Sequence, residues 1–279
     1  MRIMGLLGLD VLLGAIIGLN YIDKIEPDMI EITNVSLKLP RLPNVFSGFK
    51  LVQISDIHVG HWMTPERFVP IVEMVKELSP DLVALTGDII LAYRGMPEEQ
   101  PVLYEFSNVL KNLANEYSTI AVLGNHDYRF NSAVVKDALE LAGVIVLMNS
   151  IFSLERHGKQ FHIAGVDDVS KGHSDLDAVL AALPDDGGSM LLVHEPDFAD
   201  ISAATGRFDL QISGHSHGGQ VVVPMIGPLV LPSLAKKYFS GLYKVKDMYQ
   251  YTNRGVGMTF PSVRFNCRPE ITVFTLESA

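Results

Sequence analysis

The sequence predicts an α/β fold in which two β-sheets pack together with helices outside them. Short apolar runs of four or five residues alternate along the chain with amphipathic segments of helical length. Further strand-like stretches occupy the middle and the end of the chain. No linker rich in Gly, Pro or Ser divides the sequence after residue 24. We therefore expect residues 25–279 to form one α/β domain, preceded by a separate N-terminal segment.

Residues 1–24 predict a membrane anchor or a signal segment. The stretch 4–22 is apolar apart from Asp10, Asn20 and its small residues, and it is at the short end of a membrane span. An uncleaved signal anchor, a cleaved signal peptide, a helix on the membrane surface and an apolar helix packed on the domain all fit this pattern. We expect membrane association. Arg2 before the stretch and Lys24 after it give too little charge bias to indicate the side.

The alternation of apolar and polar residues over 28–40 predicts a half-buried strand. Apolar runs then predict buried strands, and amphipathic segments between them predict helices. The expected strands are 51–55, 82–86, 119–123, 190–193 and 210–213. The expected helices are 65–78, 101–113, 131–142, 175–183 and 197–205.

Two further groups of strands are expected outside this alternation. They lie at 144–148, 151–155 and 161–166 in the middle, and at 220–223, 241–245, 249–252 and 271–276 near the end. The segment 221–234 is very apolar for a loop that contains three prolines. It predicts either a lipid-facing flap beside a site or core beneath the last hairpins.

Composition narrows the class of protein and of partner. With 48% hydrophobic residues the chain has enough apolar side chains to bury a core, which excludes a largely disordered protein. The net charge of −10 leaves no sequence-wide basic surface, so no nucleic-acid partner is expected. Cys267 is the only cysteine, so any metal must be held by His, Asp, Asn or Glu. The composition does not indicate an oligomeric state.

Each of the five buried runs ends at a side chain that can bind a metal. The ends read SDIHVG, TGDII, LGNHDY, LVHEPD and SGHSHGG. Taken singly, an Asp or Asn after a strand is more often a turn or helix cap, and a lone His is more often a hydrogen-bonded core or loop residue. Loops at the carboxyl ends of neighbouring strands converge, however, so the five ends together predict one metal site. Its candidate ligands are Asp56, His58, Asp88, Asn125, His194, His215 and His217.

The number of candidate ligands indicates two ions. One ion that keeps an open position for substrate cannot use all seven side chains, whereas two ions that share a carboxylate can. The spacings D-x-H and H-x-H place alternate side chains on one side of an extended segment, as two ligands of one ion require. A nitrogen and oxygen set without thiolate suits Mn, Fe, Zn, Co or Ni better than Mg or Ca. Mn is the expected ion.

The order D-x-H, G-D, G-N-H-D, a single His and G-H-x-H resembles the calcineurin-like metallophosphoesterase superfamily, with all five motifs intact between Asp56 and His217. The tail, GHSHGGQ and later RGVGMTFPSVRFNCRPEI, is similar to one bacterial branch. That branch has an N-terminal apolar segment and includes membrane-associated phosphodiesterases, some of them UDP-2,3-diacylglucosamine pyrophosphohydrolases of lipid A synthesis. The resemblance implies a four-layer αββα sandwich of two mixed sheets at the bacterial cell membrane.

The resemblance also implies roles for the motif residues. Asp56, His58, Asp88 and His217 are expected to hold the first metal. Asp88 bridges to a second metal, which Asn125, His194 and His215 complete. His126 matches the family's non-ligand histidine, which faces the scissile phosphate. The residues after Asp88 lack the acidic side chain that orients this histidine in the phosphoprotein phosphatases, so its orienting residue is left open, with Asp127 as a candidate.

A two-metal site of this kind predicts hydrolysis by in-line attack of a metal-bridging hydroxide, without a covalent enzyme intermediate. If it is protonated, His126 stabilises the developing charge or acts as general acid. Asp167 and Asp168, which follow another predicted strand, are expected either to line the substrate side or to form a turn. Arg254, Arg264 and Arg268 are expected either to bind a second phosphate or sugar acid, or to form ordinary ion pairs.

The expected function is therefore a dinuclear metal-dependent phosphoesterase that acts on a phosphodiester or pyrophosphate bond of a phosphorylated small molecule or lipid-linked substrate. The leading substrate is UDP-2,3-diacylglucosamine, cleaved to UMP and lipid monophosphate. A cell-envelope phosphodiesterase acting on wall polymer or glycerophosphodiesters is the alternative. A hypothesis of another class is a non-catalytic, metal-stabilised module that binds a membrane partner.

Overall fold

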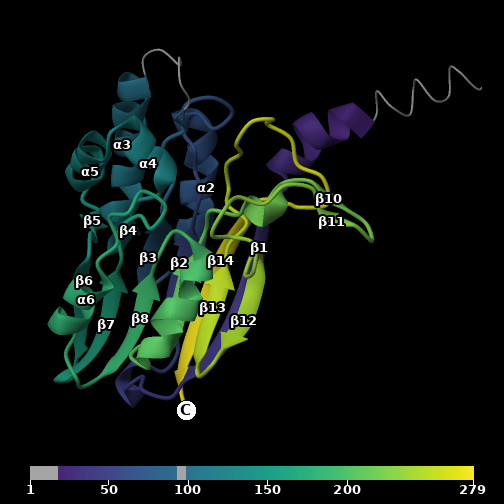
Figure 1. Cartoon of the computed structure of the whole chain (residues 1–279). Coiled ribbons are helices and arrows are strands. Elements are labelled where there is room, and N and C mark those ends of the chain that lie inside the picture. Colours follow the sequence, from purple (N-terminus) through teal and green to yellow (C-terminus); the bar gives the residue numbers. More distant parts are fainter. Residues whose placement is uncertain (1–17, 93–98) are drawn as a thin grey trace, which may run out of the picture.

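A computed structural model describes residues 18–92 and 99–279 as two six-stranded sheets packed face to face (Figure 1). The first sheet has the strand order β1 (Glu31–Leu39), β14 (Glu270–Ser278), β2 (Phe49–Ile54), β3 (Leu82–Thr86), β4 (Thr119–Val122) and β5 (Ile145–Val146). All its neighbours are parallel except β14 and β2. The expected strands within 51–123 are confirmed, with bounds that differ by at most two residues.

The second sheet has the strand order β12 (Gly241–Val245), β13 (Met248–Thr252), β9 (Leu210–Ser213), β8 (Gly188–Leu192), β7 (Lys159–Gly165) and β6 (Ser150–Arg156). The pairs β12–β13 and β6–β7 at its two edges are antiparallel, and the central pairs are parallel. Both sheets are therefore mixed, as predicted. A small hairpin of β10 (Val222–Val223) and β11 (Gly227–Pro228) stands apart from both.

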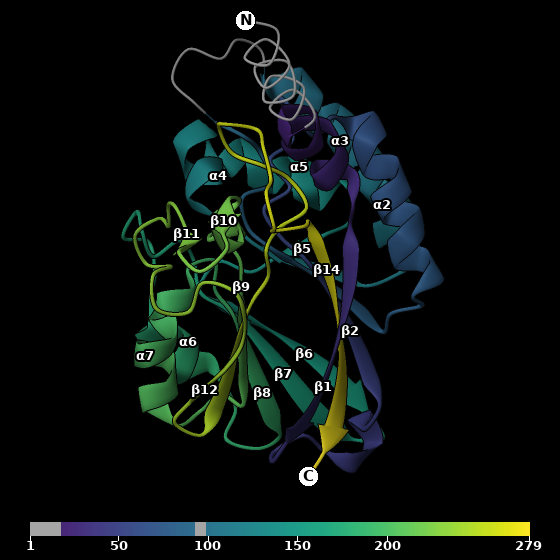
Figure 2. The same cartoon turned by 90° about the vertical axis from the view of Figure 1, so that its right-hand side faces the viewer.

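Helices cover the two outer faces, which makes four layers (Figure 2). The first sheet carries α2 (Pro65–Glu77), α3 (Glu99–Ala114), α4 (Asn125–Phe130) and α5 (Ser132–Leu141), and the second carries α6 (Leu176–Ala182) and α7 (Ala199–Ser202). The helix expected at 197–205 is broken into η4 (Pro196–Phe198), α7 and η5 (Ala203–Thr205). The remaining short helical turns are η1 (Tyr21–Ile25), η2 (Glu26–Asp28), η3 (Asn44–Phe46) and η6 (His217–Gly219).

Three clusters of buried apolar side chains fill the spaces between the four layers. The middle cluster joins the two sheets and includes Leu51 from β2, Phe161 from β7 and Leu210 from β9. A second cluster lies between the first sheet and helices α2, α3 and α5, and a third lies beneath α6 and α7. The central strands β2, β3 and β4 of the first sheet are buried on both faces, which explains why their sequences are continuous apolar runs. The predicted four-layer αββα sandwich is confirmed.

The N-terminal prediction concerns mainly residues outside the described part of the chain. Of the predicted anchor or signal segment 1–24, the structure describes residues 18–24, and residues 21–24 belong to η1. Among the described residues, no helix combines the length and the apolar character that a bilayer crossing requires.

Candidate metal centre

The eight residues singled out at strand ends lie together at one edge of the sandwich. Asp56 and His58 follow β2, Asp88 follows β3, Asn125 and His126 begin α4 after β4, His194 follows β8, and His215 and His217 follow β9. Three of these strands belong to the first sheet and two to the second. All eight residues are buried. The predicted convergence of the strand ends is thus seen in the structure, and it requires both sheets.

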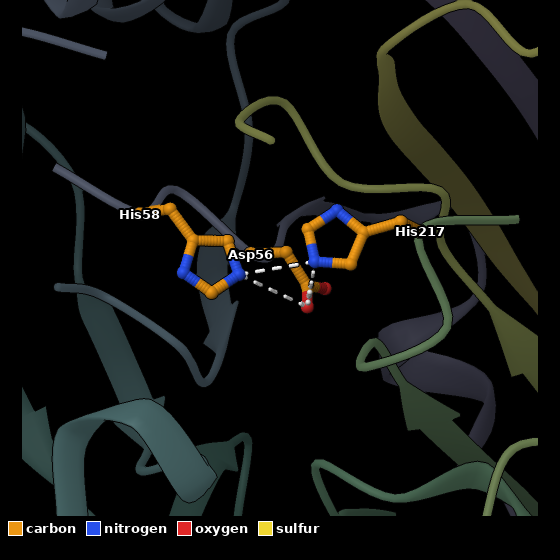
Figure 3. Close-up of side chains that lie close together, drawn as sticks. All are labelled: Asp56, His58 and His217. Atoms are coloured by element: carbon orange, nitrogen blue, oxygen red, sulfur yellow. Dashed lines mark hydrogen bonds and ion pairs between the residues drawn. The ribbon is translucent and has the colours of Figure 1, made fainter. Parts of the chain in front are cut away.

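The first group of potential ligands is formed by Asp56, His58 and His217 (Figure 3). The Nε2 atoms of His58 and His217 are 3.0 Å apart, and Asp56 Oδ1 lies 3.4 Å from His217 Nε2 and 4.0 Å from His58 Nε2. Both imidazole rings turn toward the Asp56 carboxylate (Figure 3). These separations place three ligand atoms around one point, as tetrahedral or octahedral coordination requires.

A second group is formed by Asp88, His194 and His215. His194 Nε2 lies 3.2 Å from His215 Nδ1 and 3.2 Å from Asp88 Oδ2. The same Asp88 oxygen is 3.5 Å from His58 Nε2, which belongs to the first group. Asp88 therefore stands between the two groups, where a bridging carboxylate is expected.

Strained backbone holds five of these residues in place. Asp56, His58, Asp88, His215 and His217 have φ values of 48°, 51°, 53°, 70° and 52°. This left-handed region costs a residue with a Cβ atom about 1–3 kcal/mol, and such strain persists where the surrounding structure over-determines it. Five instances at one site indicate that the surrounding structure holds these side chains in fixed positions.

Glycines allow the strand-end loops to approach one another closely. A Cβ atom on Gly214 would collide with Ser55 and with the Asp56 carboxylate, and one on Gly124 would collide with Asp88. With no side chain at position 214, the His215 N–H approaches and donates to Asp56 Oδ1 at 3.0 Å. The glycines of the predicted motifs therefore bring potential ligands from different strands into contact.

Burial sets the protonation of two of the potential histidine ligands, whereas the Asp88 carboxylate raises the pKa of a third, His194, well above its usual value against the effect of burial. Burial lowers the pKa of His58 to about 3 and that of His215 to about 4, so both imidazoles are neutral near pH 7. Burial raises the pKa of Asp56 to about 7. Burial acts in the same direction on Asp88, but His194 and His126 hold the pKa of its carboxyl well below the usual range. Neutral imidazole and ionised carboxylate are the forms that bind metal.

The residues fit a pair of divalent ions. Asn125 Oδ1 is buried and accepts no hydrogen bond from the residues that the structure describes, as expected for an oxygen reserved for a metal. The donor set contains only nitrogen and oxygen, in agreement with the prediction from the sequence. Distance alone also groups His126 with His58 and Asp88, although the resemblance makes His126 a non-ligand. The assignment of each ligand, and the non-ligand role of His126, stay predictions.

Arg129 is a site residue that the sequence did not single out. It lies one turn after His126 on α4, and its Nη1 is 3.3 Å from His126 Nε2 and donates to the Ala92 carbonyl at 3.2 Å. Both side chains line a cavity of about 490 Å³ that also contains Asp88, Asn125, His215 and His217. The sequence offered one signal for Arg129: it lies three residues after His126, and residues three apart are neighbours on the surface of a helix such as α4.

Asp127 organises the loops around His126 through backbone contacts. Its carboxylate accepts hydrogen bonds from the backbone N–H groups of Ile89 at 2.9 Å, Ile90 at 3.1 Å and Gly124 at 2.9 Å. The Nδ1 atom of His126 instead accepts from the Ala92 N–H at 3.3 Å. Asp127 therefore ties the loop after β3 to the start of α4, and the Ala92 N–H takes part in orienting His126.

Asp167 and Asp168 adopt the alternative role of turn residues. Asp168 Oδ1 accepts from the Ser170 hydroxyl and from the Lys171 N–H, so it stabilises the turn that follows it. Asp167 accepts from the Tyr128 hydroxyl at 2.5 Å. Neither carboxylate is among the groups that line the cavity. Their role in substrate binding stays a prediction that these contacts do not support.

Arg254 and Arg264 likewise use their guanidinium groups on protein partners. Arg254 pairs with Glu270 at 3.0 Å and with Glu31 at 2.9 Å. Arg264 is fully buried and donates to the backbone carbonyls of Arg254, Gly255, Gly257 and Cys267. Neither side chain lines the cavity, so the predicted contact with substrate phosphate gains no support from this arrangement.

Comparisons with known proteins agree with this geometry. The family described as calcineurin-like phosphoesterase matches residues 49–219, which contain every predicted ligand. The metallophosphoesterase YkuE of Bacillus subtilis is 37% identical over 94% of this chain and 90% of its own length. The phosphodiesterase YaeI of Escherichia coli is 30% identical over 93% of both chains. This chain therefore belongs to the calcineurin-like phosphoesterases.

Proposed function

We propose that this hydrolase cleaves a phosphodiester or pyrophosphate bond in a substrate that also carries an apolar group. Membership of the family makes the protein a hydrolase of phosphoester bonds, and the clustered ligands imply divalent metal ions. The observation that carries the finer proposal is the composition of the cavity. Potential metal ligands form one wall, and Leu229, Val230 and Phe260 contribute to an apolar wall beside it.

The proposed metal positions follow the two groups of ligand atoms. Asp56, His58 and His217 would hold one ion and Asn125, His194 and His215 the other, with Asp88 between them. We propose Mn as the native ion. When bound, two such ions polarise phosphate oxygens and lower the pKa of bound water.

His126 and Arg129 are proposed to contact the phosphate from the protein side. Burial lowers the pKa of His126, so its imidazole is neutral near pH 7. Because Nδ1 accepts from the Ala92 N–H, the proton of the neutral ring is placed on Nε2. His126 Nε2–H and the Arg129 guanidinium then offer two adjacent donors to a non-bridging phosphate oxygen, and charge-assisted donors of this kind are strong.

UDP-2,3-diacylglucosamine is the leading proposed substrate, because it combines a pyrophosphate with acyl chains that suit the apolar wall. Cleavage would give UMP and the lipid monophosphate. The alternative is a cell-envelope phosphodiesterase acting on wall polymer or glycerophosphodiesters, and the name of the Escherichia coli relative, a phosphodiesterase, favours it. Both alternatives place the protein at the bacterial cell membrane, and the apolar sequence of residues 4–22 supports that location.

Phosphorus NMR with purified full-length protein tests this proposal. The protein is stripped of metal, reloaded with Mn and mixed in detergent with UDP-2,3-diacylglucosamine, beside a tube that contains a chromogenic phosphodiester. We expect UMP and lipid monophosphate to appear only with metal. Cleavage of the chromogenic diester alone would favour the envelope phosphodiesterase.

His126→Ala separates catalysis from a non-catalytic, metal-stabilised module. We expect this variant to keep its metal content and to lose turnover by about 10²–10³-fold, the usual cost of removing one hydrogen-bond donor to the developing charge. His157→Ala, in the exposed turn between β6 and β7, is the matched control and should leave turnover unchanged. Unchanged turnover in His126→Ala would refute the assigned role, and absence of turnover in the wild type on both substrates would favour the module.

A further inference from the structure

We infer that an exposed apolar rim at the cavity mouth docks on a lipid bilayer, so that the metal centre opens toward the membrane surface. The rim consists of Met225, Ile226, Leu229, Val230 and Phe260. This inference rests on the proposed function, because it names a membrane as the partner of the same site. Its physical basis is independent of which phosphoester is cleaved.

The rim is unusually exposed for side chains of this kind. The exposed fractions of its five side chains range from 58% for Leu229 to 105% for Met225. Isolated apolar residues are common on protein surfaces, whereas a contiguous group marks an interaction site. The segment 210–235 contains no Asp, Glu, Lys or Arg, so four of these side chains protrude from an uncharged stretch.

The backbone holds the rim in its exposed position. Val222 pairs with Pro228 and Val223 with Gly227 in the β10–β11 hairpin, and Met225 at its tip has a φ of 64°. The Val222 N–H donates to the Phe265 carbonyl at 2.9 Å, which links the hairpin to the loop that carries Phe260. Leu229 and Val230 after the hairpin turn and Phe260 on the loop line the same cavity, so the two segments present apolar side chains at one opening.

The described part of the chain begins near the loop that carries Phe260. The Ile22 carbonyl accepts a hydrogen bond from the Arg264 N–H at 2.9 Å, and Leu19 and Val263 line a second cavity together. Residue 18 is thus close to the loop that carries Phe260, and the sequence before it, 4–17, is apolar except for Asp10. In both views the hairpin, this loop and η1 lie toward the end of the molecule away from the C-terminus (Figures 1 and 2).

A bilayer is the occupant that explains these features together. A second copy of the chain would cover the rim, but it would also cover the cavity, because Leu229, Val230 and Phe260 line both. A lipid surface instead continues into the apolar wall of the cavity. An amphiphilic phosphoester can then reach the metal ligands while its chains remain in apolar surroundings.

Site-specific fluorescence tests the docking directly. Cysteine is introduced in the full-length chain at Met225, Phe260 or, as a control of similar exposure, Leu141 on α5. Each variant is labelled with an environment-sensitive dye and added to vesicles of phosphatidylethanolamine and phosphatidylglycerol. A chain without an introduced cysteine reports background labelling of buried Cys267. We expect a shift to shorter wavelength at positions 225 and 260 and none at 141.

The outcomes of this experiment decide the inference without reference to activity. Unshifted emission at both rim positions, whether or not the protein floats with the vesicles, would overturn it. A shift that needs no vesicles and grows with protein concentration would identify a second copy as the occupant and would also overturn it. If the rim docks but no substrate is cleaved, the proposed function fails while the docking surface stands.

Activity measurements provide a second readout that rests on the proposed function. The double variant Met225→Asp, Ile226→Asp changes side chains that do not line the cavity. Each side chain buried in lipid contributes about tenfold or more to partition, so kcat/KM on vesicle-borne substrate should fall by at least about tenfold. The rate on a water-soluble diester should stay unchanged, and Leu141→Asp should change neither. Equal loss on both substrates would contradict the docking role.

Discussion

Replacing Arg264 by Lys tests whether this buried arginine organises the metal centre or binds substrate. Its Nη1 donates to the Cys267 carbonyl at 3.0 Å, and its Nη2 is within 3.0 Å of three carbonyl oxygens in the segment 254–257. That segment rests on the first ligand loop, where the Gly257 N–H donates to the Asp56 carbonyl at 2.9 Å. The guanidinium therefore joins the C-terminal loops to the strand end that carries Asp56.

The expected loss of stability in Arg264→Lys follows from the number of backbone carbonyl groups that lose a hydrogen-bond donor. An ammonium group concentrates three donors at one point and lacks the planar fork that spans both sides of this site. At least two buried carbonyls lose a charged donor at about 1.5–3 kcal/mol each, so Arg264→Lys should lower the free energy of unfolding by about 3–6 kcal/mol. Arg268→Lys, at an exposed arginine four residues along the chain, should change it by less than about 0.5 kcal/mol.

Urea unfolding of the metal-loaded protein measures this difference. We expect the midpoint of Arg264→Lys to fall clearly below that of Arg268→Lys at an unchanged slope. If Arg264 instead bound substrate phosphate, KM would rise while stability remained close to the wild type. A stable Arg264→Lys variant with a raised KM would refute the structural role.

Three further changes probe the centre itself. Asp88→Asn removes the carboxylate between the two ligand groups; we expect fewer bound ions by mass spectrometry and at least about 100-fold lower turnover, and full metal occupancy would contradict the bridging position. Gly214→Ala places a Cβ against Ser55 and Asp56; thermal unfolding should show a loss of about 1–3 kcal/mol, and an unchanged midpoint would show that the loops can separate freely. Arg129→Met removes the guanidinium beside His126; kcat/KM should fall about 10- to 100-fold at constant metal content, whereas a loss of metal would show that Arg129 acts on the ligands.

The sequence predicted the elements of this fold more fully than their arrangement. Strands 82–86 and 210–213 appear with the expected bounds, because short continuous apolar runs bounded by turn residues are typical of strands buried on both faces. The place of β14 could not be predicted. It lies between β1 and β2, parallel to one and antiparallel to the other, and sequence periodicity does not report which strand pairs with which.

Short sequence motifs also determined which site residues could be predicted. Asp56, Asp88 and His217 stand in motifs of a few residues, whose spacing carries the chemistry. Arg129 stands in no such motif and was missed. Arg264 was singled out for a phosphate contact or an ion pair, whereas in the structure it donates to backbone carbonyls. An arginine that is fully buried among carbonyls and one that lines a cavity read alike in the sequence, since charge and residue type do not encode burial.

The sequence alone predicted the layers, the family and a set of candidate ligands, because hydrophobic periodicity and metal-ligand spacing are short-range properties. The tertiary structure decided that Asp88 stands between the two ligand groups, that Arg264 donates to backbone carbonyls of the C-terminal loops, and that Met225, Ile226, Leu229 and Val230 of the segment 221–234 are exposed. These features depend on how two sheets from distant parts of the chain meet at one edge. The packing of the two sheets brings these residues together, and local sequence patterns do not report contacts between distant segments.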